Sequence, residues 1–117
     1  NPPGFAFENY DAFGRFREQD NGITVNASGT FSLDNGETFT FTDGVELAYQ
    51  MAESDQVKDC YVEHWANYAL GYPLEENQET LSDLQSLFRS DDNVIELLIA
   101  MTTSDFFRYL NGQGVTP

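Results

Sequence analysis

Basic residues are scarce in this chain of 117 residues. Five Lys and Arg stand against 20 Asp and Glu, so the formal net charge is −15 at pH 7. Nucleic acids bind mainly to Lys and Arg side chains that neutralise phosphates, and anionic membrane surfaces attract the same side chains. The charge therefore predicts that neither nucleic acid nor an anionic membrane is a partner, and it leaves weakly held divalent cations open.

Long apolar runs and cysteines are equally rare. No stretch approaches the roughly 20 apolar residues that a membrane-spanning helix needs, so we expect no membrane insertion. The single cysteine, Cys60, can form neither a disulfide within the chain nor a metal site rich in thiolates. The chain opens abruptly at Asn1, inside patterned sequence, and we expect it to be a piece of a longer protein.

Turn-forming dipeptides and alternating residues dominate the first part of the chain. Asn-Gly and Asp-Gly pairs separate short runs suited to strands, and Phe39 and Phe41 alternate with threonines as a half-buried strand requires. From residue 43 to about residue 110 the apolar residues recur at helical spacing instead. The sequence thus predicts a single α+β domain over residues 1–117, in which a small antiparallel β-meander over 14–42 packs on a bundle of four to five short helices over 43–110.

The central helix of this predicted fold lies within residues 54–73, which contain the chain's only His, Trp and Lys. Ser54 can cap its start and Gly71 can end it. Apolar and aromatic residues recur here at steps of three and four, which predicts a face turned toward the core. The predicted core face comprises Val57, Cys60, Tyr61, His64, Trp65 and Tyr68.

Further helices are predicted on both sides of this one. Asp43 and Glu46 have the spacing of a capping box at the start of a helix that ends near Glu53. Ser90 is the predicted cap of a later helix, in which the residues from 94 to 101 leave few positions for water. That later helix is therefore expected to be the most buried.

Cys60 and His64 lie four residues apart and would share one face of the helix. Two ligands do not complete a zinc site, and a thiol–imidazole nucleophile normally draws its members from separate segments. We interpret Cys60 as a buried, inert thiol and His64 as an imidazole at the edge of the core. A role for His64 as a metal ligand or an axial haem ligand is the minor alternative.

The remaining candidates for chemistry are carboxylates and aromatic rings. Acidic residues at predicted helix starts are explained by the helix dipole, although two of them could converge in the fold as the carboxylates of a glycosidase do. Exposed aromatics of the meander could stack on a sugar, and core packing is the alternative for the same rings. These patterns identify no catalytic residue and no metal site.

Two stretches together resemble a known protein family. The opening NPPGFAFENYDAFGRFR, followed by DNGITVNASGTF, resembles the segment just after a CxxCH haem motif in large secreted bacterial proteins, chiefly of planctomycetes, myxobacteria and marine proteobacteria. VKDCYVEHWANYALGYP, with TTSDFFRYL further on, resembles the C-terminal domain of unknown function in the same cytochrome c-associated proteins. The two motifs together cover nearly the whole chain.

The resemblance implies a secreted or periplasmic bacterial parent with a c-type haem just before Asn1 and with this chain at its C-terminus. The chain lacks a CxxCH motif, so we expect no cofactor within it. Arg15 is expected to pair with Glu8 or Asp11, and Gly14 to supply the backbone freedom that leads into the sheet. The residues that match the motifs and are expected to define the fold are Gly4, Phe5, Glu8, Asn9, Asp11, Gly14, Arg15, Cys60, Trp65, Tyr68 and Gly71.

These observations favour a non-catalytic accessory module of a secreted c-type cytochrome-like protein, which supports or docks a haem domain and has the parent's other domains as partners. A module that binds carbohydrate or a cation is the alternative, and a hydrolase with converging carboxylates is the second alternative. Under the leading hypothesis Cys60 is buried and inert, or it is bonded to a cysteine elsewhere in the parent.

Overall fold

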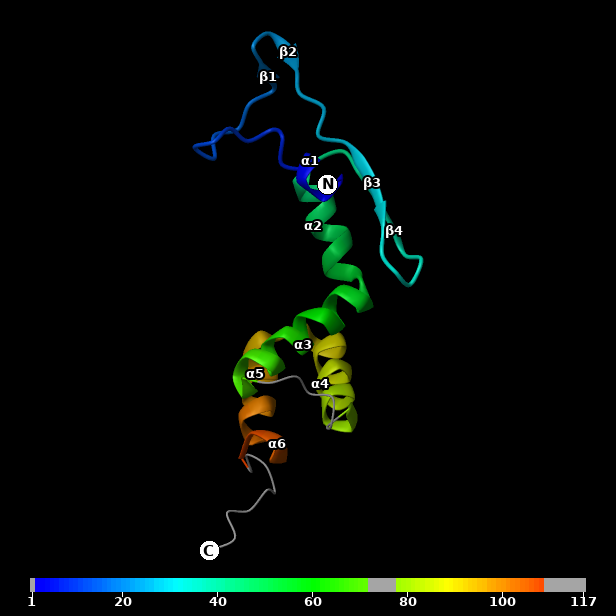
Figure 1. Ribbon diagram of the computed structural model, residues 1–117, viewed down its shortest axis with the longest axis vertical. Coiled ribbons are helices and arrows are strands. Elements are labelled where there is room, and N and C mark those ends of the chain that lie inside the picture. The colour runs from blue at the N-terminus through cyan, green and yellow to red at the C-terminus, as the bar shows by residue number, and fades with distance from the viewer. Residues whose placement is uncertain (1, 72–77, 109–117) are drawn as a thin grey trace, which may run out of the picture. The chain divides into compact units, whose positions relative to one another are not determined.

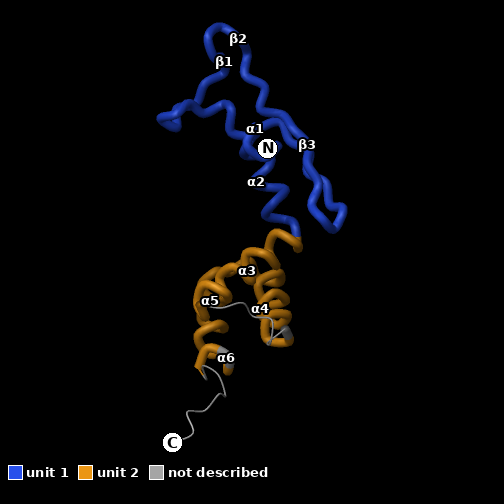
Figure 2. The backbone as a smooth tube through the Cα atoms, viewed as in Figure 1, with its two compact units in different colours: residues 1–54 blue, residues 55–117 orange. Residues whose placement is uncertain are grey.

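The computed structural model describes residues 2–71 and 78–108 of the chain. The backbone divides into two compact units, residues 1–54 and residues 55–117 (Figure 2). The first unit combines strands with helices, and the described part of the second is helical (Figure 1). The predicted α+β class is therefore confirmed, while the expectation of a single domain stays a prediction.

Strands in the first unit form two separate antiparallel hairpins, β1–β2 and β3–β4. The strands are β1 (Gln19–Asp20), β2 (Ile23–Thr24), β3 (Gly29–Ser32) and β4 (Thr38–Phe41). Between the hairpins, the Asn26 carboxamide oxygen accepts hydrogen bonds from the backbone amide and the hydroxyl of Ser28, at 3.1 and 2.6 Å. This turn lies where one hairpin ends and the next begins, and the four strands form two sheets in place of the single continuous meander predicted for residues 14–42.

The larger hairpin buries one face through its phenylalanines. Phe39 and Phe41 in β4 are 2% and 1% exposed while the threonines between them face solvent, which confirms the predicted alternation. The Phe31 ring of β3 stacks on Phe39 with the ring centroids 5.1 Å apart. Gly29 lies opposite Phe41, and the space left by its missing Cβ is occupied by the Phe41 ring.

Helix α2 (Gly44–Glu53) packs against β4 and runs beside this hairpin (Figure 1). Asp43 caps the helix as predicted, because its carboxylate accepts hydrogen bonds from two backbone amides of the first turn at 2.9 and 2.8 Å. The Gln50 carboxamide donates to the Thr40 carbonyl at 2.7 Å. With Leu47 buried on the same side, α2 is fixed to the hairpin by both apolar packing and hydrogen bonding.

Helices of the second unit surround a small core. They are α3 (Asp55–Leu70), α4 (Gln78–Asp91), α5 (Val94–Thr103) and α6 (Asp105–Arg108). The buried side chains of this core are Val62, Ala66, Leu84, Phe88, Leu97 and Met101. Gly71 follows α3 with φ at +75°, and its amide donates to the Asn67 carbonyl at 2.9 Å, which confirms the predicted end of this helix.

Two ion pairs join α3 to α4 and to Asp92, the residue that follows α4. Lys58 Nζ lies 2.7 Å from Asp92 Oδ1, and Arg89 Nε lies 3.3 Å from Asp59 Oδ1. Because the carboxylates remain partly exposed, each pair contributes about 0.2–1 kcal/mol to stability. The chain's only lysine thus links α3 to the residue that follows α4.

The buried face of α3 differs from the predicted one. Val62 and Ala66 are fully buried, whereas Cys60, His64 and Tyr68 are exposed. Successive residues in a helix are about 100° apart around the axis, so the buried residues lie nearly opposite Cys60 and His64. Small side chains on the buried side let α4 pack closely, and rings with polar ends remain at the surface.

Helix α5 begins at a different cap and is less buried than the sequence predicts. Asn93 caps it, because its carboxamide oxygen accepts hydrogen bonds from two amides of the first turn at 3.0 and 3.3 Å. Ser90, the predicted cap, lies inside α4. Ile95 and Ile99 are 69% and 50% exposed, since the buried core contacts the side of α5 that carries Leu97 and Met101.

Candidate functional site

An aromatic hollow lies on the exposed side of α3. Among the described residues it is lined by Tyr61, His64, Trp65 and Tyr68, and its volume is about 390 Å³. The ring planes of Tyr61 and Trp65 meet at 71°, and those of Trp65 and Tyr68 meet at 90°. Because neighbouring rings are edge-to-face, they form a corner and not a flat platform.

The core of the second unit supports this hollow from behind. Tyr61 stacks on Phe88 of α4 with ring centroids 5.3 Å apart and ring planes at 25°. Phe88 belongs to the buried core, and Trp65 packs against that core. The hollow is therefore held by ordered rings and can receive a small cyclic group, with the His64 imidazole as a polar partner at its wall.

Cys60 and His64 share a helix as predicted, but neither side chain is buried. The interpretation of Cys60 as a buried thiol and of His64 as a core-edge imidazole is therefore wrong, because the small residues of α3 occupy the buried side instead. Within residues 2–71 and 78–108, no group of three or more His, Cys, Asp or Glu side chains could hold a metal ion. A role for His64 as a metal or haem ligand stays a prediction.

The motif at the N-terminus forms a series of turns after α1 (Pro2–Phe5). The Asp11 carboxylate accepts hydrogen bonds from the backbone amides of Phe13 and Arg15 at 2.8 and 2.9 Å. Gly14 has a φ of +75°, which confirms that it supplies backbone freedom at this turn. The exposed Gly4 and Phe5 lie in α1, so neither contributes to the buried core of the first unit.

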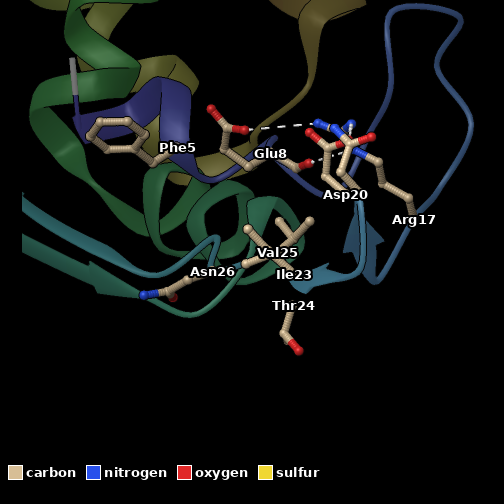
Figure 3. A pocket seen from close by; sticks show the side chains of 9 residues that line it. Phe5, Glu8, Arg17, Asp20, Ile23, Thr24, Val25 and Asn26 are labelled. Atoms are coloured by element: carbon tan, nitrogen blue, oxygen red, sulfur yellow. Dashed lines mark hydrogen bonds and ion pairs between the residues drawn. The ribbon is translucent and has the colours of Figure 1, made fainter.

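Arg17, and not Arg15, is the ion-pair partner of Glu8. The Arg17 guanidinium lies 4.0 Å from the Glu8 carboxylate and 3.1 Å from that of Asp20 (Figure 3). Asn9 fixes this arrangement, since its carbonyl accepts from the Arg17 amide at 2.7 Å and its carboxamide donates to the Arg17 carbonyl at 3.0 Å. The Arg15 guanidinium instead lies 5.8 Å from the centroid of a neighbouring phenylalanine ring.

This ion-pair cluster lines a second hollow, of about 410 Å³, between the N-terminal turns and the β1–β2 hairpin (Figure 3). Glu8 and Asp20 both face the guanidinium of Arg17, while the Thr24 side chain points away from it. A cation or a reacting acid–base pair at these carboxylates would have to displace that guanidinium. The cluster is therefore best explained as a brace for the N-terminal segment.

A third hollow, which we call the α2 groove, was not predicted from the sequence. It has a volume of about 590 Å³ and is lined by Phe7, Tyr10, Gly44, Val45, Ala48, Tyr49 and Ala52. A Cβ on Gly44 would lie 2.9 Å from the Phe7 ring, so the glycine permits the close approach that shapes one end of the groove. The signal in the sequence is a second apolar stripe on α2, separate from the one with buried Leu47.

Fold and surface together define a small α+β module with shallow apolar hollows on its surface. A family model described as a protein of unknown function (DUF1585) matches residues 36–107, which is more than half of the chain. The chain belongs to this family. No curated protein and no solved structure gives a significant match.

The family match divides the predicted motif residues into two groups. Cys60, Trp65, Tyr68 and Gly71 lie within the matched residues, whereas the motif from residue 4 to residue 15 precedes them. The match also includes all of α2 and α3, so it contains parts of both compact units. In the parts of the chain that the structure describes, no helix is both long enough and apolar enough to cross a membrane.

Proposed function

We propose that this chain is a non-catalytic accessory module of a secreted c-type cytochrome-like bacterial protein, in which it supports or docks a haem domain. The observation that carries the proposal is the exposure of aromatic rings in the N-terminal segment. Phe5, Phe7, Phe13 and Phe16 are between 50% and 85% exposed. Soluble proteins rarely leave several aromatic rings of one short segment uncovered unless a partner covers them.

The place of these rings in the sequence supports the same partner. They belong to the stretch that resembles the segment after a CxxCH motif, and they precede the matched residues 36–107. Hydrogen bonds to Asp11 and the ion pairs of Arg17 hold this segment without burying its rings. The proposed haem lies in the parent and outside this chain, and the parent is secreted or periplasmic.

The proposal is tested by joining the chain to the domain encoded upstream of Asn1. That upstream sequence should contain a CxxCH motif, and the chain alone should have no Soret absorbance. Replacing Phe13 and Phe16 by serine should lower the unfolding midpoint of the haem domain, followed by Soret absorbance on heating. The same change at Ile95 and Ile99 on α5 should leave that midpoint unchanged. A parent without CxxCH, or equal midpoints in all variants, would contradict the proposal.

Carbohydrate binding is a second candidate, favoured by the aromatic hollow on α3. Phe39 and Phe41 of the β-hairpin are buried and cannot stack on a sugar, whereas Tyr61 and Tyr68 are exposed. The corner formed by the rings suits one sugar ring better than an extended chain. Trp65 is the only tryptophan, so its fluorescence reports directly on this hollow.

A titration with soluble xylo- and chito-oligosaccharides should change the Trp65 emission if this second candidate is correct. Tyr68→Ala removes one wall of the hollow and should abolish the change. Tyr49→Ala, on α2, serves as a control and should preserve it. An emission spectrum that stays constant in the unaltered chain would rule out sugar binding at this hollow.

A further inference from the structure

We propose that the α2 groove binds a basic amphipathic helix of a partner protein. This inference rests on the proposed function in treating the chain as a docking module, and it adds the chemistry of the partner element. The described residues that line the groove come from the N-terminal turns and from α2, and all of them belong to the first unit.

The floor of the groove has the shape that an approaching helix requires. Ala48 and Ala52 are exposed, lie four residues apart and form the open floor of the groove, while Gly44 at the end of the same row is buried beneath the Phe7 ring. At 1.5 Å per residue this open floor extends over about 6 Å, which corresponds to about one turn of a partner helix. Larger side chains of that helix can enter between Phe7 at one end and Tyr49 beside the row.

The walls of the groove carry apolar surface that the first unit does not use for its own core. Val45 and Tyr49 are 57% and 73% exposed, although Leu47 on the same helix is almost completely buried. Ala48 and Ala52 are also exposed. An apolar face on a partner would remove this surface from water, which is the main source of affinity when a helix binds in a groove.

Carboxylates beside the groove select a basic partner. Tyr49 also lines a neighbouring hollow together with Glu37 and Glu53. Glu37 is held in place by the Ser54 hydroxyl, which donates to its carboxylate at 2.6 Å, and Glu53 is exposed at the end of α2. A partner helix with Lys or Arg next to its apolar face would therefore meet both an apolar floor and an acidic edge.

Net charge argues against a second copy of this chain as the occupant. Two chains that each carry a formal charge of −15 repel each other, and each would bring carboxylates to the groove of the other. A basic helix experiences attraction from the same field. The apolar floor alone could bind either a second copy of the chain or a basic helix, and the charge favours the basic helix.

The test uses the whole chain and a labelled synthetic peptide of about 18 residues in which leucines follow helical spacing and lysines fill the other positions. A control peptide has the same composition with the leucines distributed around the helix. Fluorescence anisotropy at about 0.15 M salt should give an affinity at least about tenfold higher for the amphipathic peptide. Equal affinity for the two peptides would overturn the proposal.

Substitutions in the groove locate the bound peptide. Ala48→Gln places a polar side chain on the exposed floor and should weaken binding by about tenfold. Ala69→Gln makes the same change at an exposed position of α3 and should leave the affinity unchanged. Both variants should keep the circular dichroism of the unaltered chain, because glutamine is a good helix former. Equal losses in the two variants would overturn the proposal.

A second matched pair of substitutions tests whether the carboxylates beside the groove attract the peptide. Glu53→Gln should weaken binding by about threefold at low salt and should reduce the salt dependence of the affinity. Glu63→Gln, at an exposed position of α3, removes the same charge away from the groove and should have a smaller effect on both. Identical effects of the two variants would show that the peptide responds only to net charge, which would overturn the proposal.

Analytical sedimentation tests whether a second copy of this chain, and not a basic helix, occupies the α2 groove. A dimer of the chain that Ala48→Gln dissociates would assign the groove to a second copy and would also overturn the proposal. Failure of the groove proposal can be told apart from failure of the proposed function. If the chain stabilises the haem domain through Phe13 and Phe16 but does not prefer the amphipathic peptide, the proposed function stands and only the α2 groove is rejected as a binding site.

Discussion

Single glycines determine how closely the aromatic rings of the first unit can pack. A Cβ on Gly29 would lie 2.7 Å from the buried Phe41 ring. Gly29→Ala should therefore displace this ring and lower the free energy of unfolding by about 1–3 kcal/mol. Denaturant unfolding followed by circular dichroism measures the change. Thr30→Ala, on the exposed face of the same strand, should cost less than about 1 kcal/mol, and a smaller loss for Gly29→Ala than for this control would refute the packing argument.

The exposure of side chains along α3 predicts which of two substitutions in this helix destabilises the protein more. Cys60 is exposed, so Cys60→Ser should change the free energy of unfolding by less than about 0.5 kcal/mol. Val62 is fully buried, and Val62→Ala should cost about 2 kcal/mol because it removes buried methyl groups and leaves a cavity. Thermal and denaturant unfolding should agree on this order. The reverse order, which the aromatic periodicity alone predicts, would show that Cys60 faces the core.

At the scale of whole elements, short polar residues define where the helices begin. Asn93 accepts hydrogen bonds from two free amides at the start of α5, so Asn93→Ala should cost about 1 kcal/mol. Ser90 lies inside α4, where its hydroxyl donates to the Leu87 carbonyl at 2.7 Å, and it caps no helix. Ser90→Ala should therefore leave the unfolding midpoint nearly unchanged. Equal destabilisation by the two changes would contradict the assigned start of α5.

On the scale of the whole molecule, we expect like-charge repulsion to outweigh the ion pairs of the described residues. The formal net charge is −15, while ion pairs such as Lys58–Asp92 contribute only about 0.2–1 kcal/mol each. Raising monovalent salt from about 0.01 M to about 1 M shortens the Debye length from about 30 to about 3 Å. The unfolding midpoint should therefore rise, and a gain of about 1 kcal/mol corresponds to about 4–8 °C in a domain of roughly 60–100 residues and to about 2–4 °C in one of roughly 150–250 residues.

Circular dichroism on heating measures this salt effect. Sodium and potassium chloride should act alike, because screening depends on ionic strength and not on the identity of the cation. Calcium chloride at matched ionic strength should raise the midpoint further only if divalent cations bind the acidic surface, a possibility that the charge leaves open. A midpoint that falls with monovalent salt would mean that the ion pairs outweigh the repulsion.

Local features of the fold could be predicted from the sequence because they depend on a few neighbouring residues. The alternation of Phe39 and Phe41 with threonines predicts a half-buried strand, and the structure buries both rings. Asp43 and Gly71 mark the start of one helix and the end of the next, as their side-chain oxygen and backbone freedom require. The α+β class follows from the order of these elements along the chain.

Tertiary structure decided which side of each helix is buried and where the hollows lie. Aromatic residues surround so much of α3 that its periodicity allows more than one core face, and packing against α4 selected the side with Val62 and Ala66. In the same way, the turn at Asp11 brought Arg17 to Glu8 in place of Arg15, and Gly44 admitted the Phe7 ring that shapes the α2 groove. Such outcomes depend on contacts between segments far apart in sequence, which local pattern does not determine.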